Sequence, residues 1–159
     1  MALEIERKFL IDTDKLPTLK NGYDIKQGYI QTKDKTVVRV RVKDKEAFLT
    51  IKGENIGATR LEYEYPIPLD DANEMLEKLC SKPIIDKTRY EIKQGNHIWE
   101  IDIFHKDNDG LIVAEVELEA EDETIELPNW ILKEVTDDSR YYNSNLLENP
   151  YFKWDSNFN

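Results

Sequence analysis

Charged side chains recur at every second position in several segments of this chain, as in Glu4, Glu6 and Lys8. Residues two apart point to the same side of a β-strand, so each segment would present its charges on one face. The same face of the other predicted strands carries Arg39, Arg41, Thr50, Lys52, Glu62, Glu64, Lys87, Arg89, Glu100, Asp102, Glu115 and Glu117. Lysine and arginine bind phosphoryl oxygens, and carboxylates hold Mg²⁺ or Mn²⁺. The combination indicates a metal-dependent site for a phosphate-bearing polyanion.

The opposite face of the same segments is apolar, with Arg7 and Thr88 as the clear exceptions. It carries Ile5, Phe9, Val38, Val40, Val42, Leu49, Ile51, Leu61, Tyr63, Tyr65, Tyr90, Trp99, Ile101, Ile103, Ala114, Val116 and Leu118. One interpretation is an ordinary antiparallel sheet with one solvated face. The other is a closed barrel with a charged interior, which eight strands could form around one small ligand. The almost purely ionic face, with cations and carboxylates on different strands, indicates an organised site, but alternation alone leaves both interpretations open.

Period-2 alternation predicts eight strands. They cover residues 3–10, 24–31, 36–43, 46–53, 59–67, 84–93, 97–105 and 111–120. Tight hairpin turns are expected at Asp44-Lys45 and at Gly95-Asn96, and a longer turn at 107–110. The fold class is therefore mainly β, with some helix, in a single domain over residues 1–159.

Three helices are expected to flank the strands. The first follows the fifth strand, with Asp71 as N-cap and Glu74 completing a capping box. Its apolar face would be formed by Ala72, Met75, Leu76, Leu79 and Cys80. The second is predicted over 130–135. The third is predicted over about 139–148, ending before Pro150.

The composition narrows the class of protein. The chain has 159 residues and a net charge of −11, which argues against a nucleic-acid binder and against docking on anionic lipid. No apolar run has the length of a signal peptide or a membrane span. Cys80 is the one cysteine, so an intrachain disulfide is impossible. These features predict a cytoplasmic location, no nucleic-acid partner and no membrane partner.

Several short motifs resemble the CYTH, or triphosphate tunnel metalloenzyme, superfamily. Residues 4–8 read EIERK and resemble the N-terminal ExExK signature of that family. The supporting motifs follow in family order: RVR at 39–41, TIKG at 50–53, RLEYE at 60–64, KTRY at 87–90, WEID at 99–102 and AEVE at 114–117. Downstream, VTD at 135–137 and RYYNS at 140–144 resemble the C-terminal segment of compact bacterial members, which can lie at the tunnel mouth. The resemblance favours the closed barrel over the open sheet.

The resemblance implies a closed eight-stranded antiparallel barrel, a requirement for Mg²⁺ or Mn²⁺, and a substrate that bears a triphosphate. By position, the phosphate-binding cations would be Lys8, Arg39, Arg41, Lys52, Lys87 and Arg89. The metal-binding carboxylates would be Glu4, Glu6, Glu62, Glu64, Asp102, Glu115 and Glu117. The residues expected to act in catalysis are Glu4, Glu6, Lys8, Lys87 and Arg89.

Other positions fit the family pattern less closely. Tyr29 and Arg140 are candidate substrate contacts, with rim packing and a surface arginine as the alternatives. Glu100 and Glu119 point inward by parity and could equally form ion pairs at the rim. Thr50 is expected to fill space.

Inorganic triphosphatase is the favoured activity, because the short chain lacks an evident extra segment for an adenine or thiamine pocket. Thiamine or nucleoside triphosphatase, class IV adenylate cyclase and a non-catalytic polyphosphate or nucleotide sensor remain alternatives. A homodimer is a further expectation, since exposed apolar outer strands could pack on a second copy.

Overall fold

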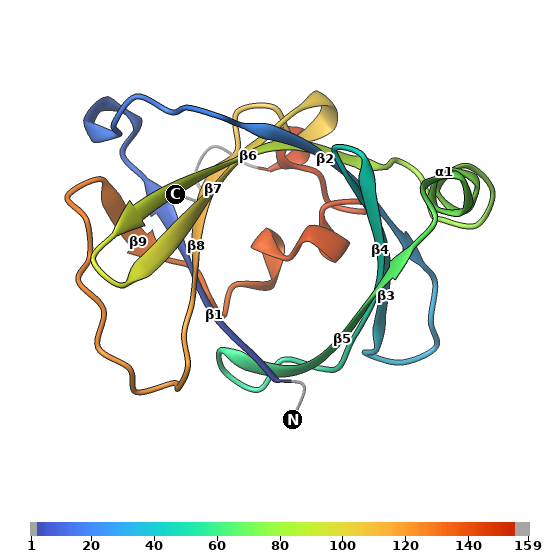
Figure 1. Cartoon of the computed structure of the whole chain (residues 1–159), viewed down its shortest axis with the longest axis horizontal. Coiled ribbons are helices and arrows are strands. Elements are labelled where there is room, and N and C mark those ends of the chain that lie inside the picture. Colours follow the sequence, from blue (N-terminus) through green and yellow to red (C-terminus); the bar gives the residue numbers. More distant parts are fainter. Residues whose placement is uncertain (1–2, 155–159) are drawn as a thin grey trace.

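The computed structural model describes residues 3–154, in which nine strands form one antiparallel sheet that closes into a barrel (Figure 1). The strands are β1 (Leu3–Ile11), β2 (Tyr23–Ile30), β3 (Val37–Lys43), β4 (Glu46–Lys52), β5 (Thr59–Ile67), β6 (Ile85–Gln94), β7 (His97–Phe104), β8 (Ile112–Glu117) and β9 (Ile131–Glu134). They follow the order β5-β4-β3-β2-β6-β7-β8-β1-β9, and pairing of β5 with β1 completes the ring. The prediction of a closed eight-stranded barrel is confirmed, with β9 as an added strand.

Strand β1 holds the closure together because its two halves use one edge differently. Leu3–Ile5 pairs with β5, while the residues from Phe9 to Ile11 pair with β9 along the same edge. The opposite edge of β1 pairs with β8. Strand β9 therefore pairs with the backbone groups of β1 that β5 leaves unpaired. Backbone N–H and C=O groups that are buried without a hydrogen-bond partner would destabilise the fold.

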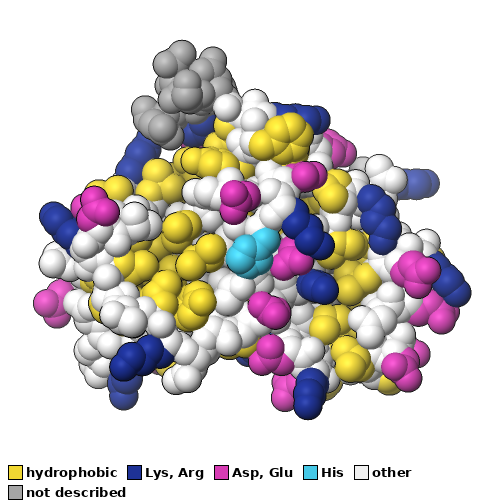
Figure 2. Space-filling view, turned by 90° about the horizontal axis from the view of Figure 1, so that it is seen from above, with side chains coloured by type: hydrophobic (Ala, Val, Ile, Leu, Met, Phe, Trp, Pro, Cys, Tyr) yellow, Lys and Arg dark blue, Asp and Glu magenta, His cyan; other side chains and the backbone are white. Residues whose placement is uncertain are grey.

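Alternation along the strands turns the charged face inward and the apolar face outward. Outside the wall, one cluster centres on Phe9, Trp99 and Trp130, with tilted and edge-to-face aromatic contacts. A second cluster lies beneath the single α-helix of residues 3–154. Figure 2 shows hydrophobic side chains gathered in patches on one face of the molecule, among scattered charges. Arg7, an outward-facing exception, pairs with Glu134 at 2.7 Å beside the Phe9 ring.

One end of the barrel interior is apolar rather than charged. Ile85, Phe104 and Val113 form a cluster there with Tyr141 and Leu146 from the C-terminal segment. In Figure 1 this segment, drawn in orange, crosses the opening of the ring. The strands and the C-terminal segment therefore close one end of the barrel, and the charged side chains line the remaining interior.

Helix α1 (Leu69–Lys78) packs on β3 and β4 through Ala72 and Leu76. The prediction of a helix here is confirmed, but the predicted capping box is wrong. The helix begins two residues before Asp71, and Pro68 at the N-cap makes no side-chain cap hydrogen bond. Asp70 and Asp71 lie in the first turn, where the helix dipole favours carboxylates. In residues 3–154, no helix is long and apolar enough to span a membrane.

The other two predicted helices are wrong. Residues 131–134 form β9, because the free edge of β1 outweighs a helix-like apolar spacing. The segment 139–148 contains the short 3₁₀ turns Ser139–Tyr141 and Asn143–Asn145 in place of a continuous helix. Polar side chains bond the local backbone there: Asp138 accepts from the Arg140 N–H, and Asn145 donates to the Ser139 carbonyl. Such bonds compete with helical ones.

Candidate active site

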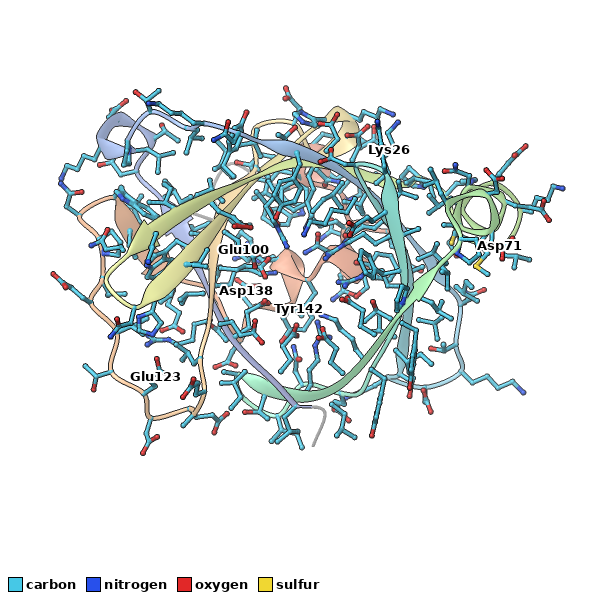
Figure 3. All side chains as sticks on the ribbon, in the orientation of Figure 1. Lys26, Asp71, Glu100, Glu123, Asp138 and Tyr142 are labelled. Carbon is cyan, nitrogen blue, oxygen red and sulfur yellow. The ribbon has the colours of Figure 1, made fainter. Side chains whose placement is uncertain are left out.

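The charged faces of the strands enclose a central cavity of about 260 Å³. The predicted site residues that line it are Glu4, Glu6, Lys8, Tyr29, Arg39, Arg41, Lys52, Glu62, Glu64, Lys87, Arg89, Glu115 and Glu117. Figure 3 shows Glu100 and Tyr142 inside the ring, whereas Asp71 and Glu123 lie outside it. The structure thus brings these predicted side chains together from seven strands, β1–β6 and β8.

Lys87 and Arg89 are held on the buried carboxylate of Asp102. The Lys87 ammonium donates to Asp102 Oδ2 at 2.7 Å, and Arg89 donates to both oxygens at 2.7 and 2.8 Å. Burial lowers the pKa of Lys87 to about 7, even though Asp102 opposes the shift. Burial works against the charge of Arg89 too, but Asp102 outweighs it and raises the pKa of Arg89. A two-donor arginine pair of this kind fixes the guanidinium in position.

Asp102 itself does not line the cavity, although the sequence suggested that it could hold metal. Its side chain is 0% exposed, and both oxygens accept hydrogen bonds from Lys87 and Arg89. Burial tends to raise its pKa, but the two cations lower it below the ordinary value. In this conformation Asp102 orients cations.

The opposite wall pairs lysine with glutamates that face the cavity. Lys52 Nζ lies 3.1 Å from both Glu4 and Glu62. Burial tends to raise the pKa of Glu4, but Lys52 and the other partners of Glu4 together lower it more. The pKa of Glu4 is therefore about 2. Burial and the neighbouring Glu4 raise the pKa of Glu62. Glu64 pairs with Arg39 at 3.5 Å and is the more exposed carboxylate.

Glu6 and Glu115 approach each other beside Lys8. Burial and the nearby Glu115 carboxylate raise the pKa of Glu6 well above its ordinary value. Burial also disfavours the charge of Glu115, but Lys8, at 3.8 Å, and the hydrogen bond from Glu6 lower its pKa. Two adjacent carboxylates cannot easily both be charged unless a cation joins them.

The donor chemistry of this wall fits a hard divalent cation. Glu6, Glu115 and Glu117 offer carboxylate oxygens to the cavity, and Mg²⁺ and Mn²⁺ prefer such ligands. In this conformation several acids are turned to lysine and arginine, and no three Asp, Glu, His or Cys side chains converge as a ligand group within residues 3–154. Carboxylates that exchange a lysine for a metal would complete the group.

Of the two further residues predicted to contact substrate, one lines the cavity and the other does not. Tyr29 is buried, lines the cavity, and accepts a hydrogen bond from Gln27 at 2.7 Å. Arg140 is not among the cavity-lining residues; it pairs with Asp138 at 2.6 Å and lies over the Tyr141 and Trp154 rings. Its guanidinium therefore braces the C-terminal segment.

The two inward acids at the rim also separate. Glu100 lines the cavity and pairs with Arg89 at 3.1 Å. Glu119 follows the end of β8, is exposed and does not line the cavity. Thr50 is buried between Arg39 and Glu64, to which its hydroxyl group bonds.

Among the residues absent from the predicted set, three make polar contacts with its members: Arg60 and Asn143 line the cavity, and Gln27 lies buried behind it. Arg60 faces the cavity and lies 3.4 Å from Glu4. Gln27 is 0% exposed and bonds Arg41, Tyr29 and Asn143. Parity could have found Arg60 and Gln27, since each shares the inward face of its strand with a predicted residue. Asn143 lies outside any strand, so alternation carries no signal for it.

Comparison with known proteins places this barrel among relatives. The CYTH domain model matches residues 2–146. A protein of Acetivibrio thermocellus named inorganic triphosphatase is 49% identical over 152 residues, covering 95% of this chain and 97% of that protein.

Solved structures agree with that match. The crystal structure of the inorganic triphosphatase NE1496 is 35% identical, covers 90% of this chain and 96% of its own, and has a TM-score of 0.64. The PH1012 protein of Pyrococcus horikoshii, 16% identical, covers 74% of this chain and 79% of its own with a TM-score of 0.59, and shares the fold.

Proposed function

The chain belongs to the CYTH domain family, and on that premise we propose that it hydrolyses inorganic tripolyphosphate to pyrophosphate and phosphate. The observation that carries the proposal is the central cavity, whose lining combines paired lysines and arginines with carboxylates. A polyanion and divalent cations complement such a lining on both counts. The inorganic triphosphatases at 49% and 35% identity support the choice of substrate.

The cations would bind and orient the substrate. Lys87 and Arg89, fixed on Asp102, would hold the phosphoryl group that is transferred or leaves. The rest of the tripolyphosphate would be bound by Arg39, Arg41 and Lys8. Donors fixed before the substrate arrives stabilise charge that develops on phosphoryl oxygens at little reorganisation cost.

The carboxylates would hold the metal and the attacking water. Glu6, Glu115 and Glu117 are the proposed ligands, with Glu4 and Glu62 available once Lys52 turns to phosphate. A bound Mg²⁺ or Mn²⁺ supplies charge neutralisation and a lowered pKa of water. We propose direct attack by water, with a neighbouring carboxylate accepting its proton.

The location and the oligomeric state are two further proposals. We propose a cytoplasmic enzyme of one domain, which a single buried cysteine supports. The outer wall of β5 is exposed at Leu61, Tyr63 and Tyr65, and it would form the contact of a homodimer.

One assay tests the activity. The protein is incubated with tripolyphosphate, ATP or thiamine triphosphate, with Mg²⁺, Mn²⁺ or chelator, and the products are separated by anion exchange. We expect equimolar pyrophosphate and phosphate from tripolyphosphate, and none with chelator. A faster reaction with thiamine triphosphate or ATP would change the substrate; a cyclic nucleotide with pyrophosphate would indicate a cyclase; binding without product would indicate a sensor.

A matched pair of variants ties the activity to the cavity. Glu6→Gln should lower kcat by about a hundredfold or more, because the proposed metal loses a charged ligand. Glu77→Gln, on the exposed surface of α1, is the control and should match the unmodified protein. Near-normal turnover of Glu6→Gln at saturating Mg²⁺ would refute the metal assignment.

A further inference from the structure

The C-terminal segment reaches into the cavity and contacts its cations directly. The Tyr141 carbonyl accepts from Lys8 Nζ at 2.9 Å, and Asn143 Oδ1 accepts from Lys87 Nζ at 3.0 Å. Packing of Tyr141 and Leu146 in the apolar end of the barrel anchors this segment. Asn143 is thus held at a fixed place beside Lys87.

Asn143 belongs to a continuous chain of hydrogen bonds, which we name the cation arc. The arc consists of Arg41, Gln27, Asn143, Lys87, Asp102 and Arg89. Arg41 Nε donates to Gln27 Oε1 at 2.8 Å, and Gln27 Nε2 donates to Asn143 Oδ1 at 3.2 Å. The arc connects three proposed phosphate-binding cations, Arg41, Lys87 and Arg89. The connection runs through the buried amide of Gln27, the amide of Asn143 on the C-terminal segment, and the carboxylate of Asp102.

The geometry restricts Lys87 in a specific way. An ammonium has three N–H donors. Two of them are directed to Asp102 and Asn143, so the third has one remaining direction, and Lys87 lines the cavity. Asp102 alone would leave the ammonium free to rotate about a single hydrogen bond.

Gln27 fixes the other end of the arc. Its amide is 0% exposed, and three of its four hydrogen-bonding positions are used: one oxygen lone pair by Arg41, and the two N–H groups by Tyr29 and Asn143. A buried amide that loses a partner is unfavourable, so this arrangement resists change. Because the Nε of Arg41 is bound to Gln27, its two terminal nitrogens are left for the cavity that Arg41 lines.

We propose that Asn143 is a positioning residue of the triphosphate site: together with Gln27 it orients the Lys87 ammonium and ties it to Arg41 before substrate binds. The inference rests on the proposed function for its kinetic consequence and on geometry alone for its binding consequence. It assigns a role in the reaction to a residue that lies on no strand of the barrel.

Three variants of two asparagines test the proposal. Asn143→Leu keeps the approximate size of the side chain and removes the acceptor. Asn143→Asp keeps the acceptor and adds a negative charge. Asn145→Leu is the matched control, since Asn145 lies on the same segment, is exposed, and its side chain bonds only the Ser139 carbonyl among residues 3–154.

The readouts are kcat and KM for tripolyphosphate, calorimetric affinity for tripolyphosphate in chelator, and the thermal midpoint. Asn143→Leu should lower kcat and metal-free affinity, each by about tenfold. Its midpoint should fall modestly below that of Asn145→Leu, because the buried Gln27 amide loses one partner. Asn143→Asp should restore kcat to within about threefold and raise KM, because its carboxylate competes with phosphate for Lys87.

The result that overturns the proposal is Asn143→Leu matching Asn145→Leu in kcat and metal-free affinity. Equal loss of kcat in Asn143→Leu and Asn143→Asp would overturn it as well, since an acceptor would then not be what matters. If the unmodified protein does not hydrolyse tripolyphosphate, the proposed function fails. The metal-free affinities then decide the positioning role by themselves.

Discussion

The two walls of the central cavity hold their charges in different ways. In the cation arc, the side chains of Lys87 and Asp102 are 1% and 0% exposed, and their hydrogen-bonding positions are largely occupied by protein. In the opposite wall, which we name the carboxylate wall, the Glu62 and Glu64 side chains are 25% and 41% exposed. This wall consists of Glu4, Glu6, Lys52, Glu62, Glu64, Glu115 and Glu117. The arc is fixed, whereas the carboxylate wall can exchange partners.

This difference indicates a division of labour. Fixed cations are suited to a ligand whose charge and shape are constant, such as a triphosphate. Carboxylates that pair with Lys52 in the absence of ligand can release it to phosphate and turn to a metal. Ligand binding would thus break the Lys52 pairs and leave the Asp102 pairs intact.

The largest loss of stability is expected for a substitution in the cation arc. Asp102→Ala leaves Lys87 and Arg89 as buried cations without their carboxylate, which should lower the free energy of unfolding by about 3–5 kcal/mol. Urea denaturation measures the loss. A decrease below about 1 kcal/mol would mean that solvent reaches these cations and that the two walls do not differ.

The matching change in the carboxylate wall should cost less stability. Lys52→Met removes the partner of Glu4 and Glu62, but these acids face the cavity and can take up protons. We expect about 1–2 kcal/mol by the same denaturation, with hydrolysis of tripolyphosphate reduced at least about tenfold. A loss as large as that of Asp102→Ala would contradict the contrast between the walls.

The smallest loss of stability is expected for an ion pair on the outer surface of the barrel, which belongs to neither wall. Arg7→Leu removes the pair with Glu134, whose side chain is 37% exposed, and should cost only a few tenths of a kcal/mol. The hydrogen bond from Arg7 lowers the pKa of Glu134 below 4.5. The contribution is therefore complete above the ordinary pKa and is lost as the pH falls through the lowered value.

Denaturation of Arg7→Leu and the unmodified protein at pH 7 and at pH 3 measures that sign. The difference between the two proteins should shrink at pH 3. A difference that grows in acid would assign the stabilising role of Arg7 to a contact other than Glu134, such as the Phe9 ring.

Alternation carried most of what the sequence could predict. A period of two placed Lys87 and Arg89 on one face and Tyr90 on the other, and the barrel keeps that division. The same parity could not distinguish Asp102, which lies beneath the cations, from acids that face the cavity. That distinction depends on depth within the barrel, which alternation does not encode.

The segments after β8 were predicted least well, for a physical reason. Ile131 pairs with Ile11 because β5 pairs only with Leu3–Ile5 and leaves the rest of that edge of β1 free. Asn143 reaches Lys87 because Leu146 fills the end of the barrel. Contacts of this range leave no periodic signal in the sequence.

The net charge of −11 also has a different meaning once the barrel is seen. Six cations and seven acids of the predicted set nearly balance inside, so the acidity belongs almost wholly to the rest of the molecule. An acidic chain can therefore enclose a polyanion site whose opposed charges are arranged on two walls.

The most direct test of this division is the affinity for tripolyphosphate without metal. Calorimetry in chelator should show that Lys87→Met weakens binding by about tenfold or more, because a fixed phosphate donor is lost. Glu117→Gln should bind within about threefold of the unmodified protein, yet lose metal-dependent hydrolysis. Equal weakening of metal-free binding by both substitutions would contradict the division between a phosphate-binding wall and a metal-binding wall.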